Sequence, residues 1–380
     1  MQREYVPSIY PYSFINMSTL DTFIKKLKYM NERHNIAARK QLAMSHSGER
    51  QCAKPLTPAQ KKEICDFWES ISDTKKQYFD FFWYEVYNGI CDEPEKLKYY
   101  IPNDFYYCYV DYYFSNDHFG RKFDDKTLYE LYYPEIKHPE TIIRKSGVDM
   151  LDSHYQIIDM DTAIHLCHDA GTVIYKPAQT EGGGKGIRFW STGDDEGQLK
   201  SLLTSKCFVI QKLIRQHEVL NKIHDKSVNT IRALTLQYKG EVRVMSAILR
   251  MGSNGKRVDN GSSGGMFCGI LPDGQLRPIA TDFSGISYTH HPQGACFAEI
   301  KIPGFSKACS LAKQMAPRLQ SVTRLISWDM AIGEDGEPIL VEANLYYGGC
   351  NVHQLCNGPI FGDMTEDILR HVFKHNPMLK

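Results

Sequence analysis

The sequence predicts an α+β fold with two or three lobes, and three observations support this prediction. The chain has 380 residues, which is long for one simple domain. Helical periodicity is concentrated in residues 1–100. The later apolar runs are short and meet at tight turns such as Lys239-Gly240 and Asp335-Gly336, which is typical of antiparallel hairpins. Hairpins mixed with helices favour an α+β architecture over a regular βαβ series.

The composition is that of an ordinary globular protein, with 42% hydrophobic and 24% charged residues. Lysine plus arginine equals aspartate plus glutamate, at 45 each, so no general affinity for nucleic acid or anionic membranes is expected. The eleven cysteines contain no CxxC pair, which argues against a disulfide framework or a zinc site and favours a reducing cytoplasm. We expect neither a membrane-spanning run of roughly 18–20 residues nor a signal peptide.

Residues 1–100 are predicted to be helical. Ser18 is a candidate helix cap, and Thr57-Pro58 is a second start signal with proline at the first helical position. A third helix is expected over residues 73–87. Two apolar stripes mark the second and third helices, and we interpret them as packing surfaces: Ile64, Phe67, Trp68 and Ile71, then Tyr78, Phe79, Phe82, Trp83 and Val86.

Shorter helices and strands are predicted from about residue 101 onward. In the first part, helices are expected at 124–136 and 161–170, and strands at 140–145, 172–177, 187–190 and 207–214. In the second part, hairpins are expected at 230–252 and 325–344, and helices at 304–319 and 364–374. Pro317 should interrupt or end the helix that contains it.

The hairpin at residues 325–344 carries an acid in each of its two apolar strands. If Asp335-Gly336 forms a two-residue type I′ loop, Asp329 lies directly opposite Glu342. Asn344 follows two residues later and therefore points to the same face of the sheet.

Two carboxylates at a directly paired position repel each other, and a divalent cation would reverse the sign of that interaction. Carboxylate and amide oxygens suit Mg²⁺, which often binds nucleotide phosphates as well. The alternative is that both acids simply face water. Apolar neighbours argue against a fully solvated face: Ile326, Trp328, Met330, Ile339, Leu340 and Val341.

A glycine-rich loop lies between two predicted strands in the segment VIYKPAQTEGGGKGIRFW, residues 173–190. It is not a P-loop, because Lys185 is followed by Gly186 and a strand rather than by Ser or Thr and a helix. Such a loop could fold over a triphosphate and donate backbone N–H groups, with Lys176 as a point charge for phosphate. The alternative is a mobile hairpin tip.

Two further strands carry weaker signals. The apolar strand at 207–214 becomes polar after Ile214, so its backbone could meet an adenine edge, and Glu218 could accept hydrogen bonds from ribose hydroxyls. Arg232 lies at a strand entry and must be paired if it is buried. Its partner could be an incoming phosphate or carboxylate, or a structural acid. A second small-residue loop, residues 260–270, could approach a bound anion closely.

Taken in order, these segments resemble the ATP-grasp superfamily: the glycine loop after YKP, then QKLI, NTIRALT and WDMAIGEDGEPILVEAN. The pattern of motifs over about residues 120–365 is most similar to that of the sugar-transfer-associated ATP-grasp family. The resemblance implies two α+β lobes that clamp ATP, with a helical N-terminal segment. The implied boundaries are a helical region at 1–100, a pre-grasp or linker segment at 101–170, a small lobe with the glycine loop at 171–214, and a large lobe with the metal-binding hairpin at 215–380.

The resemblance also implies roles for single residues. The positions that bind Mg²⁺ match Asp329, Glu342 and Asn344, and the catalytic positions match Arg232 and Lys176. The nucleotide-binding positions match Lys126 and Lys176 for phosphate, Gly183 and Gly184 in the glycine loop, Gln211, Lys212, Leu213 and Ile214 at the adenine hinge, and Glu218 at ribose. Many members carry glutamate where this chain has Gln211.

The implied activity is ATP-dependent ligation of a carboxylate to an amine or another nucleophile, through an acyl phosphate. The implied cofactors are ATP and Mg²⁺, and the implied partners are a small-molecule carboxylate and an amine or a glycan acceptor. A polysaccharide or peptide precursor is the expected substrate. Two alternatives stay open at this point: a phosphotransferase that acts on a hydroxyl, and a binding protein that keeps an inactive nucleotide fold.

Overall fold

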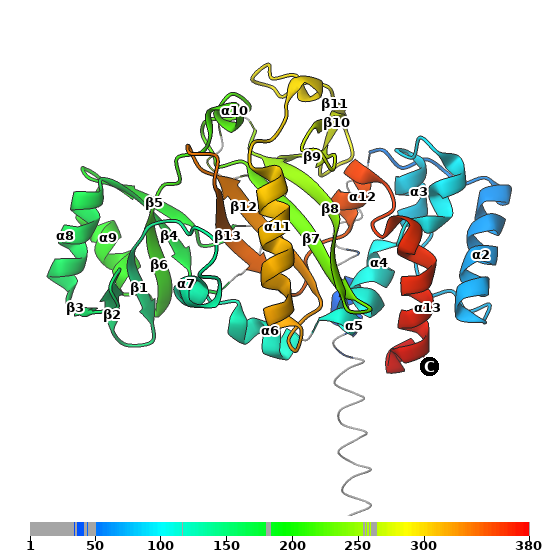
Figure 1. The fold of residues 1–380 in the computed structure, drawn as a ribbon, viewed down its shortest axis with the longest axis horizontal. Coiled ribbons are helices and arrows are strands. Elements are labelled where there is room, and N and C mark those ends of the chain that lie inside the picture. The colour runs from blue at the N-terminus through cyan, green and yellow to red at the C-terminus, as the bar shows by residue number, and fades with distance from the viewer. Residues whose placement is uncertain are drawn as a thin grey trace, which may run out of the picture.

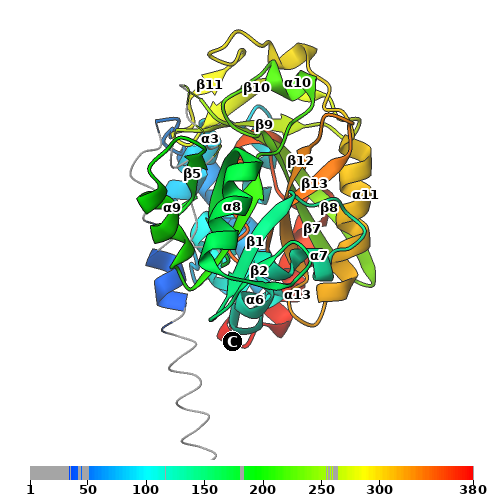
Figure 2. The same ribbon diagram turned by 90° about the vertical axis from the view of Figure 1, so that its left-hand side faces the viewer.

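Two antiparallel sheets lie next to each other in the computed structural model, with helices packed on their outer faces (Figures 1 and 2). The structure describes residues 34, 36–41, 44, 51–115, 117–179, 184–253, 255, 257, 259 and 264–379. The predicted cap at Ser18 and the glycine Gly183 lie outside these residues. All pairings between the named strands are antiparallel, which confirms the predicted α+β class.

The first sheet has six strands in the order β3-β2-β1-β6-β4-β5. Its strands are β1 (Thr141–Ser146), β2 (Met150–Asp152), β3 (Ile157–Ile158), β4 (Thr172–Pro177), β5 (Arg188–Ser191) and β6 (Cys207–Lys212). One face packs on helices α8 (Met160–Ala170) and α9 (Glu196–Leu203). Because β1 pairs with β6, the boundary expected at residue 171 falls inside a single sheet. The predicted strands and the helix at 161–170 are confirmed, and Gly171 ends that helix with φ 77°.

The second sheet has seven strands in the order β11-β10-β9-β8-β7-β12-β13. Its strands are β7 (Thr230–Tyr238), β8 (Glu241–Met251), β9 (Met266–Ile270), β10 (Leu276–Asp282), β11 (Ser287–Tyr288), β12 (Leu325–Ile332) and β13 (Pro338–Asn344). Helix α11 (Phe305–Met315) covers one face, and a 3₁₀ turn over Ala316–Leu319 continues it, so the predicted interruption at Pro317 is confirmed. The β7–β8 turn has positive φ at Lys239 and Gly240, as predicted.

The β12–β13 hairpin pairs Asp329 with Glu342, as predicted, but the predicted turn type is wrong. Gly333 donates its N–H to the carbonyl of Glu337 at 2.9 Å, so three residues form the loop. Only Gly336 of the predicted pair has positive φ, at 77°. A bulge next to Asp329 then shifts the register by one residue and restores the predicted pairing.

The helical region extends further than the sequence predicts. Helix α2 (Pro58–Ser72) begins with the predicted cap, because Thr57 and Gln60 form a reciprocal capping box. The third helix is shorter than predicted: α3 spans Phe82–Asn88, and Asp73 instead ends α2 in the left-handed region with φ 55°. Further helical segments then continue to Phe123: a 3₁₀ helix (Pro94–Tyr99), α4 (Asn103–Phe105), a π-helical segment (Tyr106–Asp111), α5 (Tyr112–Phe114) and α6 (Asp117–Phe123).

The change from helices to strands therefore comes at β1, about 40 residues later than the sequence indicates. Between α6 and β1, the helix expected at 124–136 is reduced to a 3₁₀ turn (Lys126–Leu128) and α7 (Tyr129–Tyr132). The C-terminal helix α13 (Thr365–His375) is confirmed.

The helical region packs directly on the face of the second sheet that α11 leaves uncovered. Strand residues alternate between faces, so Ile231 and Ala233 of β7 join the core under α11, whereas Leu234 and Leu236 join the core of the helices. This second core contains side chains from α2, α3 and α13, and Figure 1 shows these three helices on the same side of the molecule. Helix α12 (Asn351–Asn357) packs on strands β8, β9 and β10. Among the described residues, no helix is long and apolar enough to cross a membrane.

Candidate functional site

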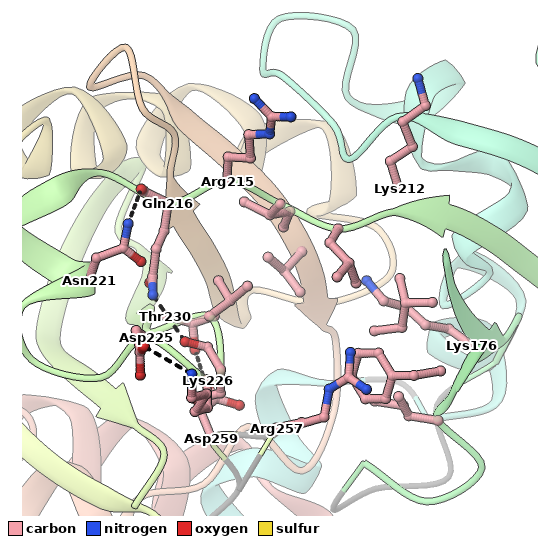
Figure 3. A pocket seen from close by; sticks show the side chains of 18 of the residues that line it. Lys176, Lys212, Arg215, Gln216, Asn221, Asp225, Lys226, Thr230, Arg257 and Asp259 are labelled. Carbon is pink, nitrogen blue, oxygen red and sulfur yellow. Dashed lines mark hydrogen bonds and ion pairs between the residues drawn. The ribbon is translucent and has the colours of Figure 1, made fainter. Parts of the chain in front are cut away.

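A cavity of ≈ 370 Å³ lies where the two sheets meet (Figure 3). Its volume falls within the range of small-molecule pockets. Strand alternation turns Ile174 and Lys176 of β4 toward the cavity, while their neighbours pack under α8 and α9. Phe189 from β5 and Val341 from β13 add apolar walls from the two different sheets. The cavity therefore has apolar walls together with several charged side chains, among them Lys176 and Arg257.

The segment after β6 forms a side of this cavity as it crosses from the first sheet to the second. Lys212, Leu213 and Ile214 line the cavity, and the next residues join the second sheet, where Gln216 bridges to Gly333. Gln211 does not line it. Its amide is buried and donates to the Thr141 hydroxyl at 3.2 Å.

Lys176 is a buried cation, with 7% of its surface exposed. No described residue is within hydrogen-bonding or ion-pairing distance of its ammonium group. Burial, reinforced by the charge of Lys126, lowers the pKa of Lys176 to about 8. Figure 3 shows Lys176 entering the cavity from β4. The charges of Glu342 and Asp259 offset the lowering of this pKa only in part. A buried ammonium without a direct partner is costly, so this position favours an anionic ligand.

The opposed acids of the β12–β13 hairpin are each paired with cations. Arg232 donates to Asp329 from Nε at 2.7 Å and from Nη2 at 2.6 Å, and Arg250 donates to the same carboxylate at 2.7 Å. Burial would raise the pKa of Asp329, but the two arginines outweigh it and lower this pKa to about 2. Glu342 pairs with Lys126 at 2.9 Å. Protein cations therefore offset the repulsion that the sequence alone suggests.

Asn344 completes the cluster on the same face. Its amide nitrogen donates to the carbonyl of Ser327 at 3.1 Å and to Asp329 at 3.3 Å, which assigns the orientation of the amide. Its amide oxygen has no partner among the described residues. These oxygens fit Mg²⁺ that also takes water and phosphate ligands. They do not form an all-protein cage, since the described residues contain no group of three or more acidic, histidine or cysteine side chains able to hold a metal.

The profile of the sugar-transfer associated ATP-grasp family matches residues 109–368. This chain belongs to that family. Among solved structures, D-alanyl-alanine synthetase A from Vibrio cholerae is similar with a TM-score of 0.39 and 12% identity, over 66% of this chain and 63% of that one. An L-amino acid ligase from Bacillus licheniformis is similar with a TM-score of 0.38 and 13% identity, over 66% and 48%. The chain thus spans about half to two thirds of these proteins. No curated protein sequence matched it.

Arg232 of this ATP-grasp protein has the structural acid partner that the sequence left open, because Asp329 occupies its Nε and Nη2. No described residue accepts a hydrogen bond from its Nη1. One side of the guanidinium therefore fixes Asp329, and the other side has donors for a further anion.

The predicted ribose acid has a different position in this ATP-grasp fold. Glu218 is exposed at the start of α10 (Glu218–Asn221) and does not line the cavity. Glu334, at the tip of the β12–β13 hairpin, does line it. No local pattern indicated this, because the hairpin tip and the segment after β6 meet only in the folded chain. In the glycine loop, Gly184 has φ 70°, a conformation that side chains disfavour.

The sequence interpretation also missed Asp259. Asp259 lines the cavity, accepts a hydrogen bond from Thr230 and pairs with Arg250 at 3.2 Å. Burial raises its pKa despite Arg250. Its only sequence signal is its place just before the small-residue loop that begins at residue 260.

Proposed function

We propose that this protein is an ADP-forming ATP-grasp ligase, which activates a carboxylate with ATP and passes the acyl group to an amine or another nucleophile. The observation that carries this proposal is the buried ammonium of Lys176, which has no hydrogen-bond or ion-pair partner among the described residues and lines the cavity between the two sheets. Apolar wall residues suit a purine, and the buried cation suits its phosphates. The acids of β12 and β13 lie on the adjoining face, where a magnesium ion would be needed.

Individual side chains have distinct parts in this proposal. Lys176 and Lys126 would bind the phosphates, and the backbone from Leu213 to Ile214 would meet the adenine edge. Asp329, Glu342 and Asn344 would hold Mg²⁺, which neutralises phosphate charge during phosphoryl transfer. Such transfer depends mostly on positioning and on charge neutralisation, so no covalent enzyme nucleophile is required.

The proposed chemistry has two steps. A carboxylate oxygen attacks the γ-phosphorus of ATP, forming a P–O bond as the bond to ADP breaks. The nitrogen of an amine then attacks the acyl carbon, phosphate leaves with the C–O electron pair, and the amine loses a proton. Arg232 lies next to the metal-binding acids and would offset the charge of the transferring phosphoryl group through Nη1.

The acceptor in this proposal belongs to a polysaccharide or peptide precursor, in line with the sugar-transfer association of the family. We also propose a reducing compartment such as the cytoplasm, because all eleven cysteines are free thiols.

A phosphotransferase is the second candidate, and Asp259 is the observation that favours it. A buried carboxylate with a raised pKa that lines the cavity is a reasonable base for a substrate hydroxyl. In that reaction the γ-phosphate would stay on the acceptor and no acyl phosphate would form.

Substituting Lys176→Met tests the site. We expect kcat/KM for ATP to fall about 100- to 1,000-fold, because one charge that stabilises the transferring phosphates is lost. The measurement is ADP release in the presence of Mg²⁺ and a panel of amino acids and sugar acids. Lys200→Met is the matched control, since Lys200 is exposed on α9 and, among the described residues, pairs only with Glu196.

The products separate the two candidates. An amide plus free phosphate indicates a ligase, and a phosphorylated acceptor without free phosphate indicates the kinase. Wild-type turnover in Lys176→Met would contradict the assignment of the nucleotide site.

A further inference from the structure

Each of the two sheets contributes to the cavity a cation that has no acid partner among the described residues. Lys176 of β4 is the first of these cations. The second is Arg257, which lies in the connection between β8 and β9 and lines the same cavity. No described residue is within hydrogen-bonding or ion-pairing distance of its guanidinium group. The proposed nucleotide site therefore contains a charged group to which no role has been assigned.

The guanidinium of Arg257 stacks on an aromatic ring of the opposite wall. Its central carbon lies 3.8 Å from the ring centroid of Phe189, which belongs to β5 and also lines the cavity. A guanidinium is planar and has five N–H donors around its edge. Stacking occupies its face and leaves these donors in the plane, where they can bind two oxygens of a phosphate. Phe189 therefore orients Arg257 without using any of its hydrogen-bond donors.

The acids in the cavity wall do not neutralise these two cations through direct contacts. Asp259 pairs with Arg250 at 3.2 Å, and Asp225 pairs with Lys226 at 3.1 Å. The third acid, Glu334, is exposed at the hairpin tip and makes no ion pair within the described part of the chain. An anion that enters the cavity therefore meets positive charge that is still available for pairing.

Other cations of the cavity wall have a different orientation. Figure 3 shows the side chains of Lys212 and Arg215 extending away from the cavity, whereas those of Lys176 and Arg257 extend into it. Lys212 is also paired with Glu140, at 2.6 Å. Like charges that face one space repel each other, and an anion bound between them reverses the sign of that interaction.

We propose that Arg257 is a phosphate-binding residue of the nucleotide site, which holds the phosphate chain from the second sheet while Lys176 holds it from the first. This inference rests on the proposed function and adds a residue that the sequence did not indicate. The guanidinium contributes only when the ligand carries phosphate, so it distinguishes a nucleoside polyphosphate from a nucleoside.

A binding measurement without turnover tests this inference. The dissociation constants of MgADP and adenosine are measured for wild-type protein and for Arg257→Met, by titration calorimetry for MgADP and by ligand-detected NMR for adenosine. We expect the Kd of MgADP to rise about 10- to 100-fold, since hydrogen bonds between charged groups are lost. The Kd of adenosine should change less than about twofold. An unchanged affinity for MgADP, or equal losses for both ligands, would overturn the inference.

Arg215→Met is the matched control. Arg215 is also an exposed arginine that lines the cavity without an acid partner among the described residues, but its side chain extends away from the cavity. The Kd of MgADP should stay within about twofold of the wild-type value. Both arginines are exposed, so we expect unchanged unfolding temperatures in both variants. If Arg215→Met weakened MgADP as much as Arg257→Met, the general charge of the cavity would explain the binding, and the role of Arg257 would be refuted.

A double-mutant cycle tests the stacking on Phe189. Phe189→Leu keeps an apolar wall but removes the ring that orients the guanidinium. The ratio of the adenosine Kd to the MgADP Kd should fall in Phe189→Leu, and it should not fall further when Phe189→Leu is added to Arg257→Met. A further fall in the double variant would contradict the view that Phe189 acts through Arg257.

Failure of this inference is distinguishable from failure of the proposed function. If Arg257→Met binds MgADP like wild type while carboxylates still stimulate ADP release from ATP, Arg257 does not bind phosphate and the ligase assignment survives. If Arg257→Met loses affinity for MgADP alone but no carboxylate stimulates ADP release, the phosphate site stands and the ligase assignment fails. Wild-type protein that binds no nucleotide would contradict both.

Discussion

Asp329 and Glu342 are directly paired across the β12–β13 hairpin, yet Asp329 is paired with two arginines and Glu342 with a lysine. Period-two alternation and a turn signal were sufficient to pair the two acids. They could not reveal Arg250 as a partner of Asp329, because 79 residues separate the two in the chain. Local patterns identify which side chains are directly paired across two strands. The cations that pair with a buried acid depend on contacts that form only when the chain folds.

At the same scale, Lys176 should make nucleotide affinity depend on pH. Its pKa is lowered to about 8 in the folded protein, and only the ammonium form binds phosphate well. Affinity for MgADP should therefore be constant below pH 8 and fall above it, by about tenfold per pH unit while the bound form stays protonated. Titration calorimetry at several pH values between 7 and 10 measures this.

Two variants separate Lys176 from other titrating groups. Lys176→Arg keeps its charge over this range and should remove the pH dependence, while Lys176→Met should bind weakly at every pH. The stability of ligand-free protein should change in the opposite direction. An unfolded lysine keeps its proton up to about pH 10.4, so the unfolding free energy that Lys176 contributes rises between pH 8 and that value. A wild-type affinity that is flat up to pH 10 would contradict the position of Lys176.

At the scale of elements, most strands and helices were predictable because they have regular periodicity. Turns and helix starts were harder to predict from the sequence. The type I′ prediction failed because Asp335 accepts a hydrogen bond from the N–H of Glu337 and keeps negative φ, which lengthens the loop. The helix expected from Asp73 starts only at Phe82, because Asp73 itself ends α2 in the left-handed region.

The start of α11 depends on the hairpin that carries the acids. Gly304 caps this helix with φ 66°, and a Cβ atom there would lie 2.4 Å from the carbonyl oxygen of Gly336. Gly304→Ala should therefore combine a left-handed penalty of about 1–2 kcal/mol with an overpacking cost of about 1–3 kcal/mol. Urea denaturation measures the sum.

Gly362→Ala is the matched control for Gly304→Ala. Gly362 also has positive φ, at 52°, but an added Cβ atom meets nothing within 4 Å. Gly362→Ala should therefore lower the unfolding free energy only by the left-handed penalty. Equal losses of stability in the two variants would show that the hairpin tip yields to the added methyl group.

At the scale of the whole molecule, the helical region shares one hydrophobic core with the second sheet. Its core includes Leu234 and Leu236 from β7 and Leu325 from β12, together with side chains of α13. A chain that begins at residue 101 would expose this apolar surface. We expect it to aggregate or to bind a hydrophobic dye, and to lose hydrogen-exchange protection in α13 and in the adjoining ends of β7 and β12.

The first sheet supplies an internal reference for this truncation. Its core consists of residues from β1 to β6, α8 and α9. Protection in β4 and β6 should therefore persist if the truncated chain stays in solution. A soluble, fully protected truncated protein would show that the helices are an independent unit.

The sequence by itself determined the order of the strands and helices, the α+β class, the pairing of Asp329 with Glu342 and the resemblance to the ATP-grasp family. Each of these follows from residues close together in the chain or from a pattern along it. Only the tertiary structure decided that Lys176 is buried without a described partner, and that Glu334 rather than Glu218 lines the cavity. Burial and charge pairing depend on which distant segments meet, and hairpins and helix caps do not encode that.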